Sequence, residues 1–107
     1  MKNSFNVTRN KQIIYNYSVK PVPARVRRFL DEIEEDMARG IQLGEQKVAA
    51  PTDFQKLQFV SLKLFDAIEN NDSNILEVLS AYLMSRKPEL NEIRIVLSDE
   101  IINLKLI

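Results

Sequence analysis

The densest group of side chains that could do chemistry is a run of five carboxylates, Asp31, Glu32, Glu34, Glu35 and Asp36. On a helix, Asp31 lies one turn from Glu35, and Glu32 lies one turn from Asp36. Paired carboxylates can hold Mg²⁺ or Mn²⁺, or share a proton as an acid–base dyad. The apolar spacing of this segment puts the carboxylates on its water-facing side, where desolvation is small. The pattern therefore indicates a solvated acidic face.

Three arginines, Arg25, Arg27 and Arg28, occupy the first turns of the same segment, where the helix macrodipole disfavours cations. One explanation is anion capture, because guanidinium groups beside free helix N–H groups suit phosphate or carboxylate. The other is pairing with the acids one turn downstream, where an exposed pair contributes about 0.3–0.5 kcal/mol. The candidate anion-binding residues are Lys11, Lys20, Arg25, Arg27 and Arg28.

Charge is divided unevenly along the 107 residues, although the net charge is zero. Residues 1–30 carry seven basic side chains and no acidic one, so the remaining 77 carry eight basic and fifteen acidic side chains. Such asymmetry can mark an arm that binds nucleic acid or another polyanion. The interpretation that we favour is a basic arm that folds back onto the acidic helices of its own chain.

Histidine and cysteine are both absent from the sequence. Serine–histidine and cysteine–histidine catalysis cannot be built from one such chain, nor can disulfides or thiolate metal sites. Gly40 and Gly44 stand apart, outside any phosphate-binding glycine loop. We therefore expect no catalytic, cofactor-binding or metal-binding residues, and we expect a protein that is not an enzyme.

No apolar run approaches the roughly 18 residues of a membrane span, and residues 1–10 hold no hydrophobic signal region. With 45% apolar residues, the chain has the composition of a folded protein. We expect one domain over 1–107, without membrane contact and located in the cytoplasm.

Apolar residues at odd positions between Phe5 and Val19 predict a strand, most clearly over 12–19. Thr8 to Lys11 could form a turn before it. We expect residues 1–10 to be frayed.

Three amphipathic helices are predicted, at about 23–39, 53–70 and 73–87. The stripe of the first includes Val26, Phe29, Leu30, Ile33 and Met37. The second has the clearest start, because Thr52 and Gln55 have the spacing of a capping box. Residues 40–51 read as a loop.

The last residues, 89–107, fit either a fourth helix or two alternating strands around Ser98-Asp99-Glu100. Their density of Ile and Val favours the strands, which would also give the N-terminal strand a partner. The expected fold is therefore α+β and mostly helical, with a three-helix core and a small antiparallel sheet made by the N-terminal strand and a C-terminal hairpin. The alternative is an all-α four-helix bundle.

The second helix is apolar on more than one side, as Phe59 and Leu62 lie outside its main stripe. Such a helix is usually central or shared with a partner. We therefore expect a non-catalytic interaction or regulatory protein that binds a protein partner or associates with itself as a homodimer; the alternative is a binder of nucleic acid or another polyanion. The candidate interface residues are Phe59, Leu62, Ile102, Leu104 and Leu106.

Overall fold

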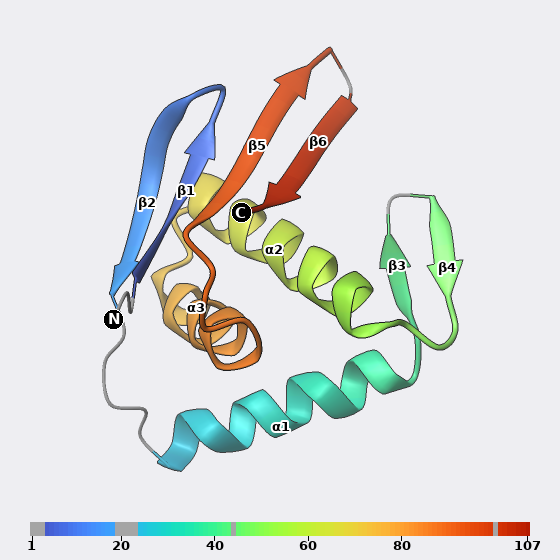
Figure 1. Cartoon of the computed structure of the whole chain (residues 1–107). Helices are drawn as coiled ribbons and strands as arrows, with labels where there is room; N and C mark the ends of the chain where they lie inside the picture. Colours follow the sequence, from blue (N-terminus) through green and yellow to red (C-terminus); the bar gives the residue numbers. More distant parts are fainter. Residues whose placement is uncertain (1–3, 19–23, 44, 100) are drawn as a thin grey trace.

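The computed structural model describes residues 4–18, 24–43, 45–99 and 101–107 (Figure 1). About 47% of these residues are helical and 33% lie in strands, so the fold is α+β. The strand content is higher than a mostly helical fold would have. The elements are β1 (Ser4–Arg9), β2 (Gln12–Ser18), α1 (Ala24–Ala38), β3 (Ile41–Leu43), β4 (Gln46–Val48), α2 (Asp53–Glu69), α3 (Ser73–Arg86), β5 (Glu92–Ser98) and β6 (Ile101–Leu106).

The main sheet has four strands in the order β2-β1-β5-β6. Its two hairpins are antiparallel, but β1 and β5 at the centre run parallel. The prediction of a purely antiparallel sheet is therefore wrong at this junction. The parallel pairing joins two segments that are distant in sequence, so no local pattern signals it.

The prediction that residues 1–10 are frayed is wrong for Ser4–Arg9, which forms β1. Phe5 and Val7 are both 1% exposed and anchor this strand in the core. Asn10 and Lys11 form the turn to β2 with positive φ angles of 48° and 72°, as a two-residue type I′ hairpin requires. The Asn10 side chain also accepts a hydrogen bond from the Leu97 N–H at 2.9 Å, which fastens the turn to β5.

The C-terminal segment is the β5–β6 hairpin, so the four-helix alternative is wrong. Ile93 and Ile95 point into the core and are fully buried, which explains why the alternating pattern prevails over the helical one.

Each of the three helices begins and ends within one residue of its predicted bounds. The predicted first residue of α1, Pro23, lies outside the described residues. The capping box at α2 is present: the Gln55 N–H donates to Thr52 Oγ1 at 3.2 Å, and the Thr52 N–H donates to Gln55 Oε1 at 2.9 Å. The loop prediction for 40–51 needs correction, because β3 and β4 form a small second sheet there. These strands have three residues each, too few to show alternation in the sequence.

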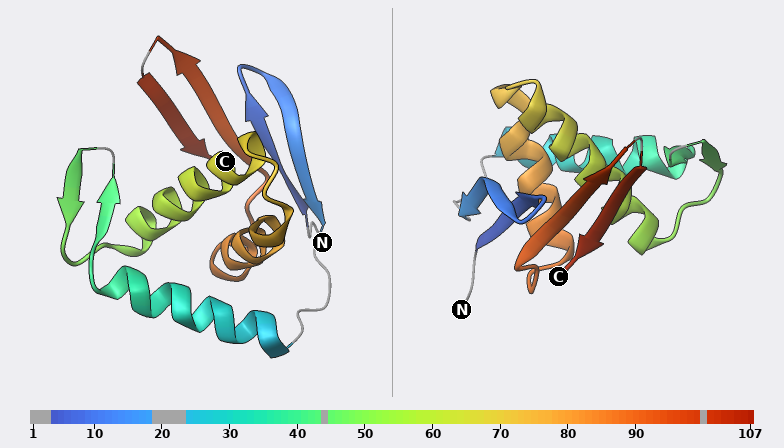
Figure 2. Two further views of the ribbon diagram at one scale, coloured as in Figure 1. Left: turned by 180° about the vertical axis from the view of Figure 1, so that it is seen from behind. Right: turned by 90° about the horizontal axis from the view of Figure 1, so that it is seen from above.

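The elements form three layers (Figures 1 and 2). The main sheet covers one side of the α2–α3 hairpin, and α1 crosses the other side. One hydrophobic core joins the layers, with fully buried side chains from the sheet and both central helices, among them Val7, Leu64, Leu83 and Ile93. Among the described residues, no helix is both long and apolar enough to cross a bilayer.

Candidate interaction surface

β6 is an edge strand of the main sheet, with β5 on one side and no strand on the other within the described chain. Glu92 and Ile107 exchange two backbone hydrogen bonds of 3.0 and 2.8 Å, which sets the alternation along the hairpin. Given the register, Ile101, Asn103 and Lys105 direct their backbone groups toward β5. The N–H and C=O groups of Ile102, Leu104 and Leu106 therefore point out of the sheet edge.

One face of β6 is apolar, with Ile102, Leu104 and Leu106, while the other face carries Ile101, Asn103 and Lys105. Ile101 is 62% exposed and Ile102 is 49% exposed, and Ile107, just beyond the strand, is 36% exposed. Lys105 is the only charged side chain in the strand. An exposed, regular and apolar edge is what soluble proteins normally protect against, so β6 has the properties of a pairing surface.

The opposite edge, β2, is different. Its pairing with β1 shifts register after Val7, which faces Tyr15, while Thr8 faces Ile13, so that Ile14 is an extra, bulged residue. A bulge twists an edge strand and discourages further pairing. The two edges are therefore not equivalent, and β6 is the one open to a further strand.

Helix α2 lies beneath β6 (Figures 1 and 2) and carries the other two predicted interface residues, Phe59 and Leu62. Both are half-buried and line a hollow of about 280 Å³ together with Gln42, Lys63 and Asp66. The Lys63 ammonium lies 5.4 Å from the centre of the Phe59 ring, within cation–π range. Leu104 and Leu106 pack against the core from the helix-facing side of the sheet, so the predicted interface residues belong to neighbouring elements.

The predicted anion-binding residues are not brought together. Lys11 is exposed at the β1–β2 turn and lines a hollow of about 410 Å³ on the sheet with Thr8, Glu92, Arg94 and Val96. Arg25, Arg27 and Arg28 are exposed on α1, in the opposite layer (Figure 1). Lys20 lies outside the described residues.

The basic N-terminal third was expected to fold back onto the acidic helices of its own chain. It does so at one place among the described residues, where Arg9 of β1 forms an ion pair with Glu69 of α2. The pairing expected between Arg27 or Arg28 and the acids one turn downstream is not formed, since neither arginine has an ion pair with a described residue.

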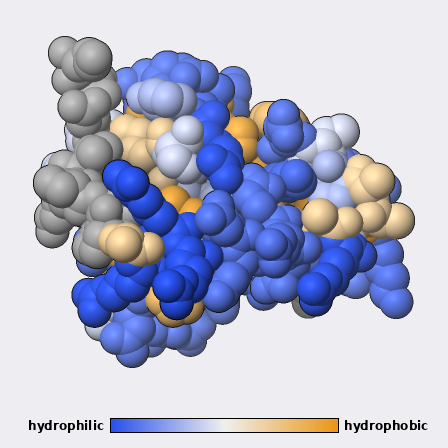
Figure 3. All heavy atoms as spheres, turned by 90° about the horizontal axis from the view of Figure 1, so that it is seen from below, coloured by the Kyte–Doolittle hydropathy of each residue, from blue (hydrophilic) through white to orange (hydrophobic). Residues whose placement is uncertain are grey.

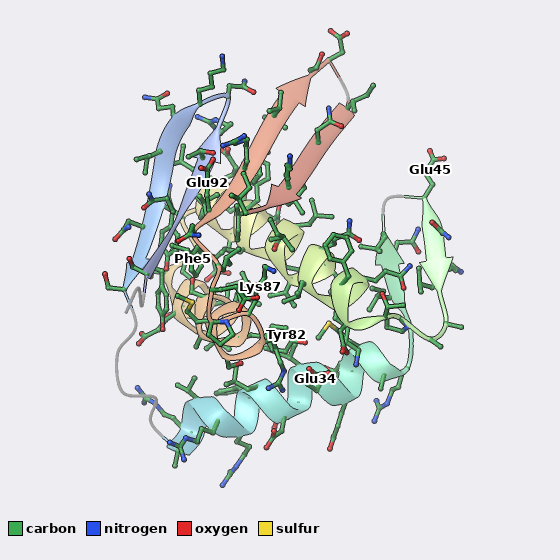
Figure 4. The ribbon with its side chains drawn as sticks, in the orientation of Figure 1. Phe5, Glu34, Glu45, Tyr82, Lys87 and Glu92 are labelled. Atoms are coloured by element: carbon green, nitrogen blue, oxygen red, sulfur yellow. The ribbon has the colours of Figure 1, made fainter. Side chains whose placement is uncertain are left out.

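Glu34 departs from the solvated acidic face that the sequence predicts, because its carboxylate joins three helices (Figure 4). Glu34 Oε1 accepts hydrogen bonds from the Tyr82 hydroxyl at 2.7 Å and from Arg86 Nε at 2.9 Å. Glu34 Oε2 accepts one from Lys56 Nζ at 3.1 Å. The group thus links α1 to α2 and α3, and a hollow of about 160 Å³ opens beside it.

Burial raises the pKa of Glu34, but the hydrogen bonds from Tyr82, Arg86 and Lys56 together outweigh burial and hold that pKa below its usual value. The pKa of Tyr82 is raised, first by burial and then by its bond to Glu34. Glu34 is therefore ionised and Tyr82 protonated at neutral pH, which suits a structural cross-link between helices. A signal for this role exists in the sequence, since Glu34 lies one turn after Leu30 and so borders the apolar stripe.

Within the described ranges, no group of three or more acidic, histidine or cysteine side chains is placed to hold a metal ion. No protein-family model, curated protein or solved structure matches the chain.

Proposed function

We propose that this chain is a non-catalytic interaction protein that associates with a second copy of itself through β6. The observation that supports this proposal is the open edge, where three residues in regular alternation direct outward backbone groups that pair with no described strand, and where Ile101 and Ile102 are exposed. Addition of a strand to such an edge is a common mode of protein association.

The pairing geometry of the proposed contact follows from the register. If two β6 strands pair antiparallel about Leu104, Leu104 faces its own copy and Ile102 faces Leu106 of the partner. All three outward-directed residues then form hydrogen-bonded pairs, giving about six backbone hydrogen bonds across the junction. A slip by two residues pairs fewer of them. Lys105 faces Asn103 in this register, so no like charges oppose each other.

Backbone pairing alone is too weak for a lasting dimer. Six hydrogen bonds at about 1 kcal/mol net each only match the low end of the roughly 4–15 kcal/mol cost of association. The remainder must come from apolar surface, at about 25 cal/mol per Å² removed from water. Ile101, Ile102 and the Phe59–Leu62 surface of α2 supply it along the same edge.

The alternative function, binding of nucleic acid or another polyanion, has less support. Lys11 and the arginines of α1 lie in opposite layers of the fold, so they do not form one basic track. The arginines are also followed within one to two turns by Asp31, Glu32 and Glu35, which repel phosphate.

Sedimentation equilibrium at ~100 μM chain and ~0.5 M salt tests the proposal, because hydrophobic contact and strand pairing persist where exposed charges are screened. We expect a mass of twice the 12.4 kDa chain. The Ile102→Lys variant should sediment as one chain, since lysine at an edge strand opposes pairing.

The matched control is Ile13→Lys, because Ile13 is 61% exposed but lies on the bulged edge β2. This variant should keep the mass of the parent chain. A parent mass of one chain, or equal masses for the parent and Ile102→Lys, would show that β6 is not an association surface.

A further inference from the structure

Helix α1 has an outward face on which charge changes sign along the axis. Arg25, Arg28, Glu32 and Glu35 are all exposed and follow one another at steps of three, four and three residues, which places them in one stripe. The opposite side of α1 buries Val26, Leu30 and Met37. From below, the molecule presents a mainly hydrophilic face (Figure 3).

This order of charges is unfavourable for the helix by itself. The first turn of α1 holds no acidic residue and the last turn no basic one, so the charges run against the macrodipole. Arg28 and Glu32 also have the weaker orientation for a pair four residues apart, with the base first. Within the described chain, none of the four stripe residues takes part in an ion pair.

We propose that this stripe binds the same stripe of a second copy, with the two α1 helices antiparallel. If the two stripes cross at the level of Leu30 along the helix axis, Arg25 faces Glu35 of the partner and Arg28 faces Glu32 of the partner. The two-fold axis repeats both pairs, giving four complementary pairs of charges. The crossing point lies within one residue of the middle of α1, so nearly the whole helix overlaps its partner.

A second copy fits this face better than other charged partners. A polyanion attracted to the arginines is repelled by the acids within two turns. A polycation attracted to the acids is likewise repelled by the arginines. Parallel alignment in register would set like charges opposite each other. Phe29 borders the stripe and is 50% exposed, so antiparallel pairing also brings an apolar side chain from each copy beside the charge pairs.

The proposed α1 contact goes beyond the proposed β6 contact and does not depend on it. The two elements lie at opposite ends of the molecule (Figure 1), so both contacts can form at once. Two different isologous contacts on one chain build assemblies larger than a dimer, of which the tetramer with three perpendicular two-fold axes is the common closed form.

Reversal of charge on the stripe tests the proposal. All chains carry Ile102→Lys to disable β6 pairing, and the salt concentration is ~50 mM. One variant adds Arg25→Glu and Arg28→Glu, which makes the stripe wholly acidic. The other adds Glu32→Arg and Glu35→Arg, which makes it wholly basic. Both sets move charge in the direction that the helix dipole favours, which offsets part of the repulsion between like charges that now lie one turn apart, and circular dichroism verifies that each chain is folded.

We expect each variant alone to sediment as a monomer, and their equimolar mixture to associate at least about tenfold more tightly than the parental stripe, with the gain lost at ~0.5 M salt. The control mixture has the same net charges placed elsewhere, with Lys11→Glu and Lys47→Glu in one chain and Glu45→Arg and Glu77→Arg in the other; it should not associate. The proposal fails if the stripe mixture stays monomeric, if it associates no better than the control mixture, or if either stripe variant alone associates as well as the parental stripe. None of these results bears on the β6 contact, which is disabled in every chain.

Discussion

Replacement of Glu34 by alanine should destabilise the fold more than replacement of any other carboxylate in the acidic run 31–36. Glu34 accepts hydrogen bonds from side chains of two other helices, namely Tyr82, Arg86 and Lys56. Its neighbour Glu35 is exposed and forms no ion pair with a described residue. The two positions therefore share a chemical type and a helix but differ in contacts.

The magnitude follows from those contacts. A hydrogen bond to a charged group contributes about 1.5–3 kcal/mol, and Tyr82, at 1% exposure, makes the most buried of the three. Arg86 and Lys56 are more accessible to water, so each of their pairs contributes roughly 0.2–1 kcal/mol. Because the hollow beside Tyr82 allows water to replace part of the loss, we expect Glu34→Ala to lower the free energy of unfolding by about 2 kcal/mol.

Urea unfolding at pH 7 measures this loss, with the chain concentration held fixed because association stabilises the folded state. Glu35→Ala is the matched control and should change the free energy of unfolding by less than about 0.5 kcal/mol. Tyr82→Phe should lower the free energy of unfolding by about half as much as Glu34→Ala does. Added to Glu34→Ala, it should lower that free energy little further, because the two side chains share one hydrogen bond. Equal effects of Glu34→Ala and Glu35→Ala would refute the assignment of Glu34 as the link between the helices.

Three further outcomes are expected. Thr52→Ala should lower the free energy of unfolding by about 1 kcal/mol in thermal or urea unfolding, because the capping box loses its hydroxyl. Ser61→Ala should leave stability unchanged or raise it by up to about 1 kcal/mol, because the buried Ser61 hydroxyl has no hydrogen-bond partner among the described residues; a clear loss in the urea midpoint would contradict this. The folded pKa of Glu34 lies below the ordinary 4.5, so its contribution is complete above that pH and is lost as pH falls through the folded pKa. The urea midpoint should therefore drop less steeply below pH 4.5 in Glu34→Ala than in the parent chain.

Local patterns predicted the elements whose cause is local. The helix bounds follow from apolar periodicity and from the Thr52–Gln55 capping box, and the β5–β6 hairpin follows from alternation. β1 was missed because its alternation rests on Phe5 and Val7 alone, just before the polar residues Thr8 to Lys11 that could form a turn. Ile14, the residue that breaks the odd-position pattern, is the bulge in β2.

Features that depend on packing between distant segments were not predictable in this way. The parallel β1–β5 pairing and the contacts of Glu34 each join residues more than 20 positions apart. Phe29 was assigned to the apolar stripe of its helix but is 50% exposed, because the buried strip of α1 is narrow and consists of Val26, Leu30 and Met37. Spacing on a helix defines a face, but the breadth of the neighbouring surface decides how much of that face is covered.

Amide hydrogen exchange along β6 tests the proposed self-association most directly. In a single chain, the N–H groups of Ile101, Asn103 and Lys105 face β5 and those of Ile102, Leu104 and Leu106 face solvent. If two copies pair at this edge, the second set should become protected as the chain concentration rises from about 5 to 500 μM, while protection of the first set changes little. Fast exchange at Ile102, Leu104 and Leu106 that does not vary with concentration would contradict the β6 contact.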